Sequence, residues 1–146
     1  MKELMQARSS LIGMRAQSSK TEDELAFSFV DEPDKVNREH DTWVASIPAY
    51  VVDRQGLFNV LARELRFPEY FGKNWDALSD LLRDFHWLHQ RRIVIVHHDL
   101  PLSQERERKT YLEILDESVK GWKSKEKHEL IVVFPSAFFP LIQGIL

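Results

Sequence analysis

Cysteine is absent from this 146-residue sequence, and its absence removes several classes of protein at once. Without thiols the chain cannot build a disulfide scaffold, a cysteine-ligated zinc site or a thiol nucleophile. Glycine is scarce too, and the five glycines form neither a phosphate-binding loop nor the strand-to-helix turn that carries a catalytic serine. We therefore expect a protein that is not an enzyme and that binds no cofactor.

Long apolar runs are also missing. No stretch approaches the roughly 18 residues that a membrane-spanning helix requires. Residues 1–20 have neither the apolar core nor the small-residue cleavage site of a secretory signal. These two absences predict a soluble, cytoplasmic protein with no membrane partner.

A strong excess of basic charge is the third absence, because the formal net charge is −3. A protein that binds nucleic acid directly usually carries such an excess, so we expect no nucleic-acid partner. Residues 120–127 are locally basic and include Trp122, which leaves a small nucleic-acid contact as an alternative. Glu126 and Glu129 dilute that charge, and we interpret the segment as a solvated loop.

The apolar content that is present suits one compact domain. Hydrophobic residues make up 43% of the chain and include four tryptophans and nine phenylalanines, which is enough for one core and too little for two. We place that domain at residues 41–146 and expect a monomer. Residues 1–40 are interpreted as an N-terminal extension, a partly ordered arm in which residues 1–24 alternatively form a short helix and residues 27–30 a short edge strand.

Strand and helix patterns alternate along the domain. Strands are predicted at 43–47, 93–96 and 130–134, and the last two are continuous apolar runs typical of strands buried on both faces. Helices are predicted at 54–66, 74–85 and 103–120, with Asp53, Asn74 and Ser103 as their N-caps. This alternation indicates an α/β fold with a small three-stranded parallel sheet and helices packed on it.

The helix predicted at residues 74–85 carries an unusual row of charge. Its core-facing stripe contains Trp75, Leu78, Leu81, Leu82 and Phe85. Asp76, Asp80 and Asp84 are four residues apart on the outward side, and like charges at that spacing oppose each other by about 0.2–0.5 kcal/mol per pair. Residues that lower the stability of their own helix in this way often lie on a functional surface. The alternative is an ordinary face of the helix exposed to solvent.

The turn before this helix adds two aromatic side chains, Tyr70 and Phe71, beside a Gly72–Asn74 turn. Core packing accounts for at least one of them. An exposed tyrosine next to carboxylates is a frequent anchor in protein interfaces, so the turn strengthens the functional interpretation.

Residues 68–82, Pro-Glu-Tyr-Phe-Gly-Lys-Asn-Trp-Asp-Ala-Leu-Ser-Asp-Leu-Leu, resemble the turn and helix start of barstar-like proteins, the intracellular inhibitors of barnase-type ribonucleases. Residues 53–65 are similar to that family's first helix, and the resemblance extends over about residues 43–134. It implies a barstar-like fold and a function, the blocking of a ribonuclease active site by carboxylates that stand where RNA phosphates would lie. The contacts that it implies are Tyr70, Gly72, Asn74, Asp76, Asp80 and, in the third helix, Glu117.

Ser79 is a departure at the same surface, because family members often have tryptophan there. The leading hypothesis is an immunity protein of toxin–antitoxin type that inhibits a small basic ribonuclease through Asp76 and Asp80. The alternative is a barstar-like module whose partner is another toxin or a regulatory protein.

Histidines near the middle of the chain suggest a metal site as a further alternative. His86 and His89 have a spacing compatible with one helix face, and His97, His98 and Asp99 follow a strand. We interpret them as solvated or hydrogen-bonded side chains and expect no metal.

Overall fold

The computed structural model describes residues 25–146, and the short helix considered within residues 1–24 lies outside this range. Four strands form one parallel sheet in the order β1-β4-β3-β2. They are β1 (Ser28–Val30), β2 (Thr42–Ile47), β3 (Arg92–His97) and β4 (Glu129–Pro135). The three predicted strands are confirmed as β2, β3 and β4. The predicted count of three is wrong because the segment near residue 28, considered only as an edge strand of the extension, pairs with β4 as a fourth strand.

The two central strands are apolar on both faces, as their sequences predict. Ile93 and Ile95 of β3 belong to the large core between the sheet and the helices. Val94 and Val96 point to the other face, where they form a smaller cluster with Val133 of β4. Both faces therefore exclude water along the middle of the sheet.

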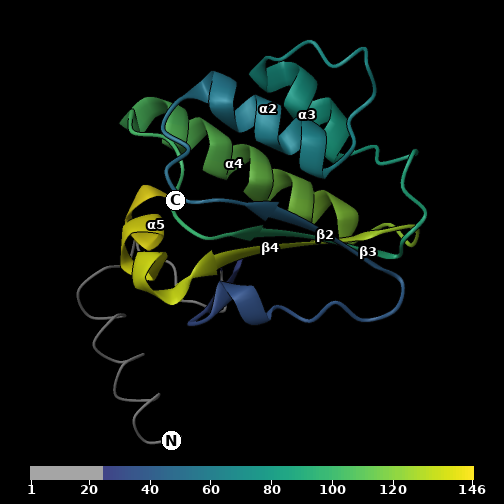
Figure 1. The fold of residues 1–146 in the computed structure, drawn as a ribbon, viewed down its shortest axis with the longest axis horizontal. Helices are drawn as coiled ribbons and strands as arrows, with labels where there is room; N and C mark the ends of the chain where they lie inside the picture. The colour runs from purple at the N-terminus through teal and green to yellow at the C-terminus, as the bar shows by residue number, and fades with distance from the viewer. Residues whose placement is uncertain (1–24) are drawn as a thin grey trace, which may run out of the picture.

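The helices α2 (Arg54–Glu64), α3 (Trp75–Leu82) and α4 (Glu105–Trp122) lie together on one face of the sheet (Figure 1). The connection from β1 to β2, which includes the short 3-10 helix η2 (Pro33–Lys35), runs under the opposite face, and Val36 packs there on the smaller cluster. After β4, the 3-10 helix η3 (Ser136–Phe138) leads into the C-terminal helix α5 (Phe139–Ile145) beside β1 and β4. The ring of Phe139 contacts Phe29 of β1 at 5.1 Å between centroids.

Two of the predicted helix starts differ in outcome. The cap at Asp53 is confirmed, since its Oδ1 accepts a hydrogen bond from the Gly56 amide at 2.7 Å. The cap at Ser103 is wrong. The N-cap position falls one residue later, at Gln104, and α4 begins at Glu105, because the Ser103 hydroxyl donates instead to the carbonyl of Val52 at 3.2 Å.

Strand β2 lies at an edge of the sheet, and Glu64 at the end of α2 covers part of it. The Trp43 indole donates to the Glu64 carbonyl at 2.8 Å, and the Ser46 amide donates to Glu64 Oε1 at 2.9 Å. The Arg66 guanidinium lies 5.2 Å from the centre of the Trp43 ring. An amide group that would otherwise face outward from the edge is thus occupied within the molecule.

Candidate functional site

The turn that leads into α3 is held by Asn74, the predicted N-cap. Its Oδ1 accepts a hydrogen bond from the Ala77 amide at 2.8 Å, and its Nδ2 donates to the Gly72 carbonyl at 3.4 Å. The left-handed residue of the turn is Lys73, with φ of 51°, and not Gly72. A Cβ added at Gly72 would lie 3.3 Å from Asn74 Nδ2, so glycine here leaves room for the cap.

The two aromatic residues of the turn separate as expected. Phe71 is half-buried and packs edge-on against Phe58 and Phe67, with ring centroids 5.8 and 4.9 Å away. Tyr70 is 67% exposed. The prediction that core packing explains one of the pair is confirmed, and Tyr70 remains as an aromatic surface residue next to α3.

The helix α3 presents two free carboxylates to solvent. Leu78, Leu81 and Leu82 are buried against the core, so the opposite side of the helix faces outward. Asp76 and Asp80 are both exposed there, with Ser79 half-buried beside them. No ion pair or side-chain hydrogen bond reaches either carboxylate from residues 25–146, which leaves both able to bind a cation.

The prediction that Asp84 is the third member of the acidic row on this helix is wrong. The helix was expected to continue to Phe85, but α3 ends at Leu82 and Phe85 takes a left-handed conformation, φ 49°, that puts its ring fully inside the core. Asp84 therefore lies beyond the helix. Its carboxylate accepts from the His86 amide at 3.2 Å and contacts His86 Nδ1 at 2.9 Å.

A cation occupies the end of the row instead. Arg83 directly follows the helix, seven residues after Asp76, and its Nη2 lies 3.1 Å from Glu117 Oε2 of α4. Both side chains of this pair are about half exposed, 47% and 62%. The structure thus places Glu117, one of the contacts that the resemblance implies, next to the end of α3, with an arginine of the same chain already bound to it.

A cleft of about 670 Å³ opens next to Asn74, between the first turns of α2, α3 and α4. Its walls combine the rings of Phe58 and Trp75 with the charged side chains of Asp53, Arg54, Lys73 and Glu107. Arg54 Nε lies 3.4 Å from Glu107 Oε2, so two of these charges neutralise each other. Neither this cleft nor the Arg83–Glu117 pair was foreseen, because each requires the relative placement of helices that are far apart in the sequence.

The histidines have separate roles. His97 is fully buried, stacks on Phe134 at 4.1 Å, donates from Nδ1 to the Val133 carbonyl and accepts from the Tyr111 hydroxyl at 2.7 Å. Burial lowers the pKa of His97 to about 3, with the neighbouring His98 acting in the same direction. Burial also raises the pKa of Tyr111. In residues 25–146, no three histidine or acidic side chains are grouped closely enough to hold a metal ion.

His98 belongs to a row that resembles part of a serine hydrolase site. Its Nε2 lies 2.9 Å from Ser46 Oγ, and its Nδ1 lies 3.3 Å from Asp34 Oδ1. Ser46 is a strand residue, however, and its amide is bound to Glu64. That amide therefore cannot stabilise an oxyanion in the way that the donors of a hydrolase site do.

Comparison with known proteins identifies a family. The model of the barstar family, described as barstar (barnase inhibitor), matches residues 48–135, which is more than half of the chain. No significant match was found among curated proteins or among solved structures. Helices of the length and apolarity needed to span a bilayer are not found in residues 25–146.

Proposed function

The chain belongs to the barstar family, and on that premise we propose that it is an inhibitor, not an enzyme, and that it blocks the active site of a small basic ribonuclease. We further propose that the bound surface consists of Tyr70, Gly72, Asn74, Asp76, Ser79, Asp80 and Glu117. In this role the protein would act as the immunity partner of a ribonuclease toxin in the cytoplasm.

The observation that carries the proposal is the pair of carboxylates on α3 that have no partner. Asp76 and Asp80 are exposed and unpaired within the described chain, on a helix whose start is fixed by the Asn74 cap. A ribonuclease must hold arginine and lysine side chains around the phosphates of RNA. Carboxylates presented on a rigid helix can form short, charge-assisted hydrogen bonds with those cations.

The surroundings of the two carboxylates support a protein partner. Tyr70 offers an exposed ring beside them, and tyrosine is enriched among residues that anchor interfaces. The cleft beside Asn74 is large enough to receive a side chain from the partner. Asp80 is proposed as the main phosphate mimic because it lies in the last turn of α3, away from the caps that hold the helix start.

The proposal is tested by measuring inhibition of basic ribonucleases by the purified protein and three variants. Asp80→Ala is expected to weaken a 1:1 complex by about tenfold to a hundredfold, because a hydrogen bond to a charged group contributes roughly 1.5–3 kcal/mol. Asp76→Ala should have a smaller effect in the same direction. Asp31→Ala removes an exposed carboxylate from the loop after β1 and should leave inhibition unchanged.

Salt provides the second measurement, since added salt screens attraction between exposed charges. Inhibition should weaken as ionic strength rises, and Asp80→Ala should reduce that dependence. Inhibition that is equally strong in the wild type, Asp76→Ala and Asp80→Ala would show that α3 is not the contact surface.

One observation favours a second candidate, a barstar-like module that binds a partner other than a ribonuclease. The Arg83–Glu117 pair places a positive charge at the end of the acidic row, and Ser79 offers only a small side chain at its centre. Such a surface suits a partner with mixed charge better than a uniformly cationic one. Capture of a partner from the native host, followed by an assay of its ribonuclease activity, separates the two candidates.

A further inference from the structure

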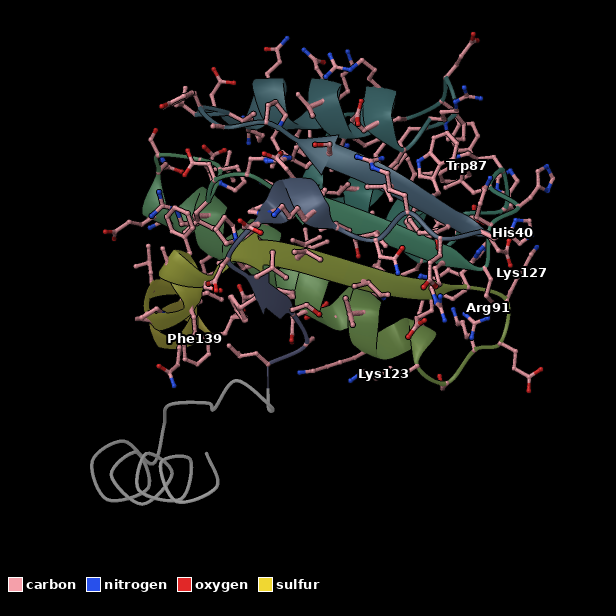
Figure 2. The ribbon with its side chains drawn as sticks, turned by 60° about the horizontal axis from the view of Figure 1, so that its bottom comes forward. His40, Trp87, Arg91, Lys123, Lys127 and Phe139 are labelled. Carbon is pink, nitrogen blue, oxygen red and sulfur yellow. The ribbon has the colours of Figure 1, made fainter. Side chains whose placement is uncertain are left out.

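A second pocket, of about 230 Å³, lies where β3 and β4 begin and α4 ends. It shares no residue with the surface proposed to bind a ribonuclease. The side chains that define its chemistry are Arg91, Trp122, Lys123, Lys125, His128 and Glu129. Figure 2 shows Arg91 and Lys127 at the end of the molecule opposite Phe139, with Lys123 on the lower side between them.

His128 is the unusual member of this pocket. The residue is only 1% exposed, and its ring is held edge-on against Trp122 at 5.2 Å and Phe85 at 6.2 Å. Its Nδ1 lies 2.7 Å from the Gln90 carbonyl and therefore carries a hydrogen atom. Its Nε2 is buried and has no hydrogen-bond partner among residues 25–146, although buried polar atoms are normally paired.

The charges around the pocket are mostly positive and mostly free. In the described part of the chain, no ion pair engages the side chain of Arg91 or Lys123, and Lys125 Nζ lies 5.0 Å from the centre of the Trp122 ring. Glu129 is the carboxylate among the lining residues, and its Oε1 is 3.4 Å from Arg92 Nε, outside the lining. Three cations thus face a pocket whose one carboxylate is already engaged.

We propose that this pocket binds a phosphate group, either as free phosphate or as the phosphate of a monoester. Arg91 offers a planar pair of N–H donors and Lys123 and Lys125 offer ammonium groups, all of which suit a tetrahedral oxyanion. His128 lines the same pocket, and its buried Nε2 has no partner among residues 25–146.

Sulfate is the cleanest probe of this site, because its charge is constant around neutral pH. Sulfate should bind with 1:1 stoichiometry.

Calorimetric titration of the full chain with sulfate and with inorganic phosphate tests the site. Arg91→Ala and Lys123→Ala should each weaken binding at least severalfold. Lys127→Ala is the matched control, because Lys127 is an exposed lysine of the same loop that does not line the pocket, and it should bind as the wild type does. Adenosine 5′-monophosphate and adenosine then separate the sources, since only the monoester should bind if esters are accepted.

His128→Gln should bind sulfate more weakly than the wild type, and circular dichroism establishes whether this variant folds. Should it not fold, the comparison of Lys123→Ala with Lys127→Ala decides the matter. The proposal is overturned if sulfate does not bind saturably, or if Lys127→Ala weakens binding as much as Lys123→Ala.

Discussion

At the scale of single residues, His97 shows how one buried side chain makes the whole fold sensitive to acid. The imidazole is enclosed between β4 and α4, and both of its nitrogens are used, one by the Val133 carbonyl and one by the Tyr111 hydroxyl. A proton added at Nε2 would replace an acceptor with a donor facing Tyr111. The native protein therefore resists protonation of His97, whereas the unfolded chain does not.

This difference predicts a loss of stability at low pH. The pKa of His97 is about 3 in the folded protein and about 6.5 in an unfolded chain, so the unfolded state binds the extra proton first. The contribution is complete above about pH 6.5 and falls by about 1.4 kcal/mol per pH unit below it, until pH approaches 3. Urea denaturation at several pH values measures this slope.

Tyr111→Phe is the companion measurement at neutral pH. It leaves His97 Nε2 buried without its donor and should lower the free energy of unfolding by about 1–3 kcal/mol. A variant as stable as the wild type would mean that the hydroxyl contributes nothing to holding the ring.

At the scale of elements, the start of α3 affects both the stability of the fold and the proposed binding surface. Asn74→Ala removes the side chain that caps the helix, and the free energy of unfolding should fall by about 1 kcal/mol. Asn74→Asp keeps an oxygen acceptor at the cap and should retain that stability. If the turn also positions Asp76, then inhibition should weaken in Asn74→Ala more than its loss of stability explains, as an assay at low temperature would reveal.

The elements also show which parts of the fold a sequence can predict. The apolar runs of β3 and β4 and the caps at Asp53 and Asn74 are local patterns, and they were predicted correctly. The end of α3 was not, because Phe85 leaves the helix to fill the core beside Trp122, whose indole donates to the Leu82 carbonyl at 2.7 Å. Such tertiary packing overrides the helical period and leaves no local mark in the sequence.

At the scale of the whole molecule, β1 shows why the predicted domain boundary at residue 41 needs a test. Ser28 pairs with Val133, and Phe27 packs its ring 5.3 Å from Phe134. A three-residue strand has too little pattern to reveal a partner about a hundred residues away. The two proposed binding surfaces differ in the same way. Tyr70, Asp76 and Asp80 lie in one segment, so the sequence alone could propose them as one surface. Arg91 and His128 lie in one pocket only because β3 and β4 are neighbours in the sheet.

Deletion tests that boundary directly. A chain that begins at residue 41 lacks β1 and the buried Phe27, and it should be less stable than a chain that begins at residue 25 by at least about 3–5 kcal/mol, the usual cost of truncating a buried phenylalanine. Chemical denaturation of the two chains gives the difference. Equal stability would confirm residues 1–40 as an extension outside the folded unit.

The covering of β2 by Glu64 has a consequence for behaviour at high concentration. A bare edge strand invites another copy of the chain to pair with it, which is a common route to aggregates. With the Ser46 amide bound to Glu64 and the Trp43 ring lying beneath Arg66, that route is obstructed in the native state. A concentrated solution of Glu64→Ala should therefore aggregate and become turbid sooner on storage than the wild type does, even where the melting temperature of the variant hardly changes.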